Sequence, residues 1–306
     1  MLSLLTNSSA LTALQNLSQT NRNLETTQSR ISTGLRVGSA ADNAAYWSIA
    51  TTMKSDNGAL STVKDALALG TATIDVATAG LNASKDLVDQ IKNKLVAAAQ
   101  PGIDRAKVQD EISALQSQLK SVADSAVFSG QNWLSVDSSA ADYNATRSVV
   151  GSYTRDGAGA VTINTIDVDI SSKVLYDSNG NLGIIDKDRT AGGSTIALAD
   201  IDISALTDSA ADITTINEYV SIADAAHADI VSASSSLGAS KARVSTQSQF
   251  IADLSDAISK GVGALVDADM NQESTRLQAL QVQQQLGVQS LSIANQNSQT
   301  ILSLFR

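Results

Sequence analysis

The chain has 306 residues, 43% of them hydrophobic, which is enough for a folded core and about two domains. Its 21 Lys and Arg against 31 Asp and Glu give a net charge of −10. This charge argues against a nucleic-acid-binding protein, which needs a basic face to contact phosphates. The absence of cysteine excludes disulfide scaffolds, Cys-based zinc sites and thiol catalysis, and 3% aromatic residues favour packed helices over an aromatic-lined pocket.

The amino-terminal segment carries a coiled-coil repeat. Its apolar residues are separated by alternating steps of four and three, with polar Asn21 and Gln28 at the missing steps: Ala10, Leu14, Leu17, Leu24, Ile31 and Leu35. No Gly or Pro precedes Gly34, so one uninterrupted helix is expected. The first basic residue is Arg22 and no long apolar run occurs, so neither a cleavable signal peptide nor membrane insertion is expected.

Two further helices are predicted before residue 130. The first runs over 43–99 with Asp42 as its N-cap, and its period survives Gly58, Gly70 and Gly80. Pro101 and Gly102 then suit a type II turn. Asp104 caps the second helix, which ends before Ser129 and Gly130.

The middle of the chain differs in composition. Residues 137–214 hold 12 Asp, no Glu and five Lys or Arg, and Asp without Glu is typical of turns and strands. Alternating runs predict strands over 161–170, 172–176 and 182–185, with a hairpin turn over 177–181. We interpret this segment as a small acidic β domain.

The carboxy-terminal part reads as helical again, with one helix over about 213–262 and then a second seam. The seam also takes steps of three and four: Met270, Glu273, Leu277, Leu280, Gln284, Gly287, Leu291, Ala294, Ser298, Ile301 and Phe305. The sequence therefore predicts a mainly α protein, a long antiparallel coiled-coil rod formed by both termini with a small β-rich outer domain inserted centrally.

Both terminal segments are nearly uncharged, with five charged residues in 1–45 and five in 264–306. A free amphipathic helix normally keeps a charged face, and two narrow stripes interrupted by polar residues bury little surface. We therefore expect these helices to become ordered only against neighbouring copies. The alternative is an ordinary two-helix coiled coil between the chain ends.

No arrangement of residues predicts catalysis, a cofactor or a metal. His227 is the only histidine, and it lies beside Asp224 and Asp229 without a second imidazole. Asp177, Asn179 and Asn181 resemble the start of a calcium loop, but no Glu closes it. Phosphate-binding Gly-rich loops and Ser–His–Asp arrangements are also absent, so we expect no enzyme.

The segment from Arg30 to Ala45 resembles the signature of bacterial flagellin, the subunit of the flagellar filament. It reads R-I-S-T-G-L-R-V-G-S-A-A-D-N-A-A and includes Arg30, Gly34, Arg36, Ser39 and Asp42. Similar motifs follow in order at Val108–Ile112, Val127–Gly130, Leu237–Ala239, Ile293–Gln296 and Ile301–Arg306. The resemblance covers about residues 1–135 and 214–306, and the middle does not match.

The resemblance implies three domains. Residues 1–45 with 264–306 would form an inner coiled coil, 46–136 with 214–263 a helical outer tube, and 137–213 a variable surface domain. It also implies that apolar seam residues pack the filament core: Leu14, Leu17, Leu24, Ile31, Leu35, Leu277, Leu280, Leu291, Ile301 and Phe305.

The resemblance further implies a secreted subunit that leaves the cell unfolded, without a cleaved signal, and joins an extracellular filament that transmits motor torque for swimming. Its partners would be many copies of itself, alone or with other flagellins, together with an export chaperone, a filament cap and hook-junction proteins. The family's innate-immune epitope carries a basic residue where this sequence has Gln90. Recognition by Toll-like receptor 5 is therefore expected to be weak.

Two alternatives stay open at this level. A hook–filament junction protein shares the terminal repeats and the export route, although the signature and the carboxy end favour a filament subunit. A cytoplasmic coiled-coil scaffold would need no extracellular insertion and would carry more surface charge.

Overall fold

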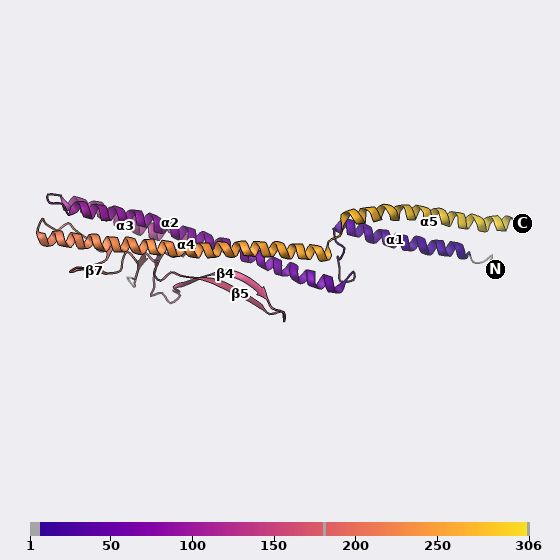
Figure 1. The fold of residues 1–306 in the computed structure, drawn as a ribbon, viewed down its shortest axis with the longest axis horizontal. Coiled ribbons are helices and arrows are strands. Elements are labelled where there is room, and N and C mark those ends of the chain that lie inside the picture. The colour runs from indigo at the N-terminus through magenta and orange to yellow at the C-terminus, as the bar shows by residue number, and fades with distance from the viewer. Residues whose placement is uncertain (1–6, 180–181, 305–306) are drawn as a thin grey trace. The chain divides into compact units, whose positions relative to one another are not determined.

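The computed structural model describes residues 7–179 and 182–304, with side chains of the last helix up to Gln296. Five helices dominate the described chain (Figure 1): α1 Ser8–Thr33, α2 Ala44–Ala98, α3 Arg105–Ser125, α4 Ala210–Val266 and α5 Met270–Leu304. They lie where the sequence predicts them, and the mainly α architecture with a small strand-containing middle is confirmed. The chain forms two compact units, one of residues up to Gly58 with those from Ser255 onward, the other of 59–254.

Local sequence explains where the first helices begin and end. The Asn7 side chain accepts a hydrogen bond from the Ala10 N–H and so caps α1. Gly34 ends α1 in the left-handed conformation, at φ 73°. The predicted turn before α3 is present, since Gly102 has φ 81°. Asp104 caps α3, as predicted, because its side chain accepts a hydrogen bond from the Lys107 N–H.

In the first unit, α1 and α5 lie antiparallel, so the described parts of both chain ends point the same way (Figure 1). Beside them is a small apolar core of Val37, Ala50, Val262 and Val266, bordered by partly buried Leu35, Met53, Ile258 and Leu265. This cluster has four buried side chains, so it contributes little apolar burial to the first unit.

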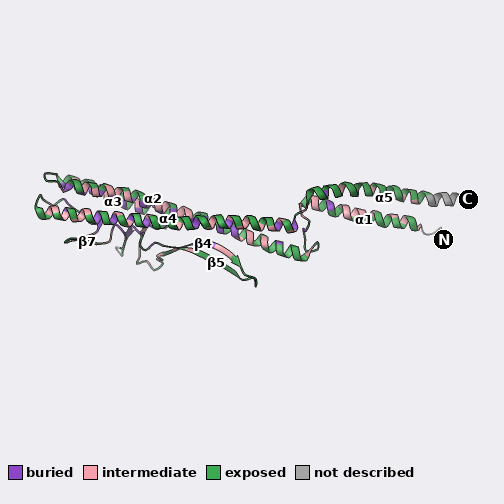
Figure 2. Cartoon of the chain, in the orientation of Figure 1, coloured by how far each residue is buried: buried purple, intermediate pink, exposed green. Residues whose placement is uncertain are grey.

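In the second unit, α2 and α4 run antiparallel, and α3 packs with them. Buried side chains recur along the inner faces of these helices (Figure 2), and the largest fully buried ones include Leu67, Ile74, Leu81, Ile91, Leu95, Ile112 and Leu119. Ion pairs join α2 to α4 at Asp75–Lys241 and Lys92–Asp224, with N···O distances of 2.6 and 3.1 Å. The long apolar stripes therefore predict this bundle correctly.

Within the described residues, the strands form four two-stranded sheets. β1 Val127–Phe128 pairs antiparallel with β2 Gln131–Asn132, and β3 Ser135–Val136 pairs in parallel with β6 Tyr176–Asp177. β4 Thr146–Arg155 and β5 Val161–Asp169 form the longest hairpin, while β7 Arg189–Ala191 pairs with β8 Ser194–Ile196. The prediction of a strand over 161–170 is confirmed, and β4 is one that the sequence analysis missed.

The predicted hairpin around 177–181 is wrong. Residues 172–176 mostly turn, no strand forms over 182–185, and the strand partner of β6 is β3. Ile184 and Ile185 instead donate backbone hydrogen bonds to Val174 and Leu175 within a buried loop. Burial of this apolar segment against the helices prevails over the local turn signal. Gly180 and Asn181 lie outside the described residues.

Side-chain hydrogen bonds join the middle segment to α3 and α4. Gln109 and Gln116 of α3 each bind the Ile201 carbonyl oxygen through their amide N–H groups, at 3.1 Å. Glu218 of α4 accepts hydrogen bonds from the Gly193 N–H and the Ser194 hydroxyl in the β7–β8 turn. Residues 193–201 of the acidic middle are therefore fixed to α3 and α4.

Of the three glycines in α2, two are sites of close approach and one is not. A Cβ at Gly70 would clash with Val149 of β4 and one at Gly80 with Leu134, whereas nothing lies within 4 Å of a Cβ at Gly58. We predict that Gly70→Ala and Gly80→Ala each lower the free energy of unfolding by about 1–3 kcal/mol through overpacking. Gly58→Ala is the matched control and should raise it by about 0.5–1 kcal/mol, because Ala is the better helix former.

Urea denaturation followed by circular dichroism measures these differences. A Gly70→Ala protein as stable as the Gly58→Ala protein would show that β4 does not pack closely on α2.

Candidate assembly surfaces

The seam between α1 and α5 contains the residues of α5 that its repeat predicts. Its buried or half-buried residues on α5 are Glu273, Leu277, Leu280, Gln284, Gly287, Leu291 and Ala294. The side chains of Ser298 and Ile301, and the whole of Phe305, lie outside the described residues. Met270, the first residue of the predicted series, is largely exposed.

The seam of α1 departs from the predicted series at two steps. Leu17, Leu24 and Ile31 are half-buried as expected, but Leu14 is 52% exposed and Gln28 is exposed, whereas Thr27 is 2% exposed. An α-helix has 3.6 residues per turn, so position 27 can occupy a seam step as well as position 28. Leu35 lies beyond the end of α1, beside the small apolar core.

Polar residues within the seam pair with one another. The Gln284 side-chain amide donates to the Asn21 side-chain Oδ1 at 2.9 Å, and the Asn7 side-chain amide donates to the backbone carbonyl of Ala294 at 3.0 Å. Arg30 forms an ion pair with Glu273 at 3.2 Å, and the Glu273 side chain is 8% exposed. Each contact forms only when its two residues lie opposite each other along the helix axes, so these contacts fix the register of α1 against α5.

The other faces of α1 and α5 expose large apolar side chains. Each of these six is more than half exposed: Leu11, Leu14, Val282, Leu286, Val288 and Ile293. The described parts of these helices carry only Arg22, Glu25, Arg30, Glu273 and Arg276 as charged residues. We call the six exposed apolar side chains of α1 and α5 the terminal apolar face. A surface so rich in apolar groups and so poor in charge is typical of a protein–protein contact.

The signature residues build a joint between the two ends of the chain. The Arg36 guanidinium donates to the Leu265 carbonyl at 2.9 Å, and the Arg36 backbone N–H donates to the Val266 carbonyl at 2.7 Å. The Gly34 carbonyl accepts from the Ala268 N–H at 2.9 Å. The segment between α1 and α2 is thereby hydrogen-bonded to the segment between α4 and α5.

Asp42 closes the turn before α2. Its Oδ2 accepts from the Gly38 and Ser39 N–H groups and from the Ser39 hydroxyl, and the Ser39 groups lower the pKa of this carboxyl. The prediction that Asp42 caps α2 is wrong, because the side chain that accepts from the Tyr46 N–H is that of Asn43. Both residues can cap a helix, and sequence alone does not separate neighbouring candidates.

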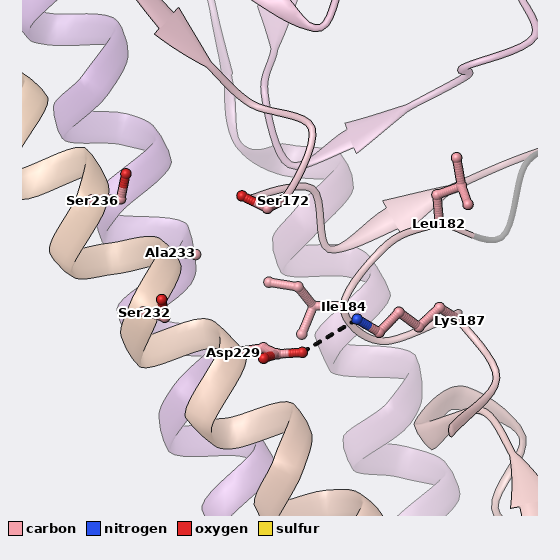
Figure 3. Close-up of a pocket in the computed structure, with 8 residues that line it drawn as sticks. All are labelled: Ser172, Leu182, Ile184, Lys187, Asp229, Ser232, Ala233 and Ser236. Carbon is pink, nitrogen blue, oxygen red and sulfur yellow. Dashed lines mark hydrogen bonds and ion pairs between the residues drawn. The ribbon is translucent and has the colours of Figure 1, made fainter. Parts of the chain in front are cut away.

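A shallow pocket of about 260 Å³ lies between α4 and the loops of the middle segment (Figure 3). Figure 3 shows Lys187 directed toward Asp229, with Ser172, Ser232 and Ser236 around the opening. Asp229 pairs with Lys187 at 3.4 Å and with Arg189 at 2.7 Å. Both cations share the one Asp229 carboxylate, and the two ion pairs join the middle segment to α4.

The residues weighed as metal ligands in the sequence, and set aside there, have other partners in the structure. His227 Nε2 lies 3.4 Å from an Asp89 carboxylate oxygen, and Asp177 accepts from the Ser138 N–H at 2.9 Å. Asn179 donates to Asp137 at 2.7 Å. In the part of the chain that the structure describes, no group of three or more His, Asp or Glu side chains is placed to hold a metal ion.

Gln90, the position of the altered epitope, is exposed on α2. Its neighbours Asp89 and Lys92 form an ion pair with each other at 3.6 Å. Because glutamine is neutral, position 90 itself adds no charge to this surface. Among the described helices, none is both long and apolar enough to cross a membrane.

Comparison with known proteins agrees with the placement of these motifs. Residues 4–139 match the bacterial flagellin N-terminal helical region, and residues 220–305 match the C-terminal helical region. The chain belongs to the bacterial flagellin family. As a member of the flagellin family, it is a structural protein that polymerises into a filament.

Full-length relatives support this assignment. The chain is 47% identical to flagellin C of Rhizobium meliloti strain 1021 and 46% identical to a flagellin of Brucella melitensis biotype 1. It is 41% identical to flagellin A of Rhizobium meliloti. Each comparison covers 100% of both chains, whereas the two family models leave residues 140–219 unmatched.

The joint gives a test of the flagellin signature. We predict that Gly34→Ala destabilises the first unit by about 1 kcal/mol, because position 34 has φ 73° and an L side chain is strained there. Gly38→Ala, in the same segment but without a positive φ, is the control and should change stability by less than about 0.5 kcal/mol. Hydrogen exchange of the amides of Arg36, Val37 and Ala268 measures opening of the joint. Equal exchange rates in the two variants would contradict this account.

Proposed function

We propose that this chain is exported unfolded and assembles outside the cell, where neighbouring copies cover the terminal apolar face and complete the inner wall of a torque-transmitting tube. The observation that carries the proposal is the exposure of six large apolar side chains on two nearly uncharged helices. In one chain these side chains contact water, which favours their burial in an assembly.

The energetics favour many neighbours over a single partner helix. Complete burial of one Leu, Ile or Val side chain contributes about 1.5–3 kcal/mol, from which the cost of association and side-chain ordering is subtracted. The seam within one chain contains Gly287 and polar pairs such as Asn21–Gln284, which specify register at a cost in stability. Contacts on both sides of each hairpin therefore offer more stabilisation than the seam alone.

Amide side chains suit the same surface. Exposed Gln281, Gln283, Gln285 and Gln289 lie on α5 among the apolar residues. An amide can be buried between subunits when it is hydrogen-bonded, whereas a charged group would have to find a counter-ion. This composition supports assembly into an interior that is partly polar.

The domain division belongs to this proposal. Residues 1–45 with 264–306 would form the inner layer, 46–136 with 214–263 the outer tube, and the acidic residues 137–213 the outer surface. An export chaperone, a cap under which subunits fold, and hook-junction proteins are the expected partners besides other copies. The lack of cysteine suits a protein that passes between redox compartments.

Replacement of exposed apolar residues tests assembly without removing the fold. We predict that Leu14→Asn with Leu286→Asn abolishes polymerisation of purified monomer or raises its critical concentration more than tenfold, because polar groups would then occupy the contact. Ile163→Asn removes a similarly exposed apolar side chain from the β4–β5 hairpin and should polymerise normally. Electron microscopy and sedimentation measure the outcome, and circular dichroism confirms folded monomers.

Normal filaments from the Leu14 and Leu286 variant would overturn the proposed assembly surface. The rival assignment to a junction protein is tested by stoichiometry, because a filament subunit dominates the protein sheared from cells whereas a junction protein contributes a few copies. Deletion of residues 265–306 should leave sheared cells without filaments of this chain.

Position 90 provides an independent prediction about recognition. An arginine at an interface adds charge-assisted hydrogen bonds, so Gln90→Arg should increase activation of Toll-like receptor 5 by about tenfold, the equivalent of about 1.4 kcal/mol. Gln249→Arg adds the same charge to an exposed position of α4 and is the control. Monomers assayed on receptor-expressing reporter cells measure the response. Equal responses of the two variants would show that the neutral residue at 90 does not limit recognition.

A further inference from the structure

Glu273 is a buried carboxylate of which one oxygen has a partner and the other has none. It lies in the first turn of α5, and its side chain is 8% exposed. Its Oε1 accepts from Nη1 of Arg30 on α1 at 3.2 Å. Its Oε2 is not reached by solvent and accepts no hydrogen bond from any residue that the structure describes. A carboxylate can accept about four hydrogen bonds, so most of this capacity is unused.

The ion pair with Arg30 compensates poorly for the burial of Glu273. A strong pair between arginine and a carboxylate is bidentate, with N···O distances of about 2.7–2.9 Å. Here one oxygen takes part, and the distance is longer. A buried ion pair repays the cost of leaving water only when its geometry is good and the remaining oxygen lone pairs are satisfied. The carboxylate of Glu273 therefore lowers the stability of the seam that it helps to align.

The start of α5 does not need Glu273 as a cap. The Asp269 side chain already accepts from the N–H groups of Asn271 and Gln272. Among the described residues, Arg30 is the one cation that pairs with Glu273. Neither capping nor a second ion pair therefore offsets the burial of this carboxylate.

We infer that Glu273 regulates the terminal hairpin, by which we mean α1 paired with α5: it selects their register and keeps their pairing weak in a lone chain. The inference deepens the proposed function, because a subunit that is exported unfolded must first open this hairpin. A polar group in a coiled-coil seam specifies register at a cost in stability. An apolar residue at position 273 would remove that cost, and the hairpin would then close more firmly before assembly.

Substitutions of the two members of the ion pair should have opposite effects on the monomer. Glu273→Met replaces the buried charge with an apolar side chain of similar size, while Arg30, which is 28% exposed, regains water. This variant should slow amide exchange of Leu24 and Leu280 in the seam by about tenfold. Arg30→Met leaves the buried carboxylate without a partner and should speed the same exchange several-fold. Hydrogen exchange of purified monomers, followed by mass spectrometry, measures both effects.

Two variants serve as controls. Glu273→Gln keeps a buried polar group with unused hydrogen-bonding capacity, so it should not slow exchange. Glu25→Met makes the same change of residue type at an exposed position of α1 and should leave the seam as it is in wild type. If Glu273→Met does not fold, Glu273→Leu is the second apolar variant and should give the same result.

The same substitution should affect assembly and export in opposite directions. A hairpin that is already ordered loses less conformational freedom on association, so Glu273→Met should lower the critical concentration for polymerisation several-fold. In cells, the amount of exported subunit should fall several-fold, because a firmer hairpin resists opening before export. Glu25→Met should match wild type in both measurements.

The outcomes separate this inference from the proposed function. Seam amides that exchange as fast in Glu273→Met as in wild type, or as slowly in Glu273→Gln as in Glu273→Met, would overturn the inference. Slower exchange without any change in critical concentration or export would overturn the regulatory role. The exchange measurements need no filament, so a wild-type chain that does not polymerise would overturn the proposed function by itself.

Discussion

Hydrogen bonds between the α1–α2 segment and the α4–α5 segment link parts of the chain that are far apart in sequence. Arg36 reaches the Leu265 carbonyl across 229 positions, and the Gly34 carbonyl accepts from the Ala268 N–H. Because Gly34 ends α1 in a left-handed conformation, the chain can leave the helix and meet this partner. The pairing of α1 with α5, and of the start of α2 with the end of α4, depends on this joint.

The distribution of charge distinguishes surfaces that contact protein from those that contact water. Residues 137–214 carry −7 of the net charge of −10, from 12 Asp and five Lys or Arg, whereas the terminal helices and the start of α2 are nearly neutral. A monomer needs charge for solubility, but a buried contact is stabilised by its absence. Concentrating charge in the middle segment reconciles these two requirements in one chain.

Helical periodicity gave the helices and their inner faces, because a stripe of Leu, Ile and Val repeated over many turns has few other solutions. The paired motifs also predicted the family. The prediction of Gln28 in the seam of α1 is wrong, because Thr27 is buried there instead and only packing chooses between these two polar neighbours. The strand pairing of β6 depended on tertiary burial of Ile184 and Ile185, which a local turn pattern does not contain.

The joint could not be derived from residue types alone. Asp42 and Asn43 are both good caps, and their separate roles follow from backbone geometry. The Arg36 contact is with a backbone carbonyl, which leaves no trace in the composition of its partner segment. Comparable interactions of side chains with main chain are hard to predict wherever they join distant segments.

The turn of the β4–β5 hairpin is a site where the sequence can change without affecting the fold. Its connecting turn is stabilised locally, since the Asp156 carboxylate accepts from the Ala158 and Ala160 N–H groups. The turn residues 156–160 are exposed and hydrogen-bond among themselves, so lengthening or replacing them alters neither bundle packing nor the chain ends. Sequence variation, or a grafted peptide repeated along the polymer, can be accommodated at this turn.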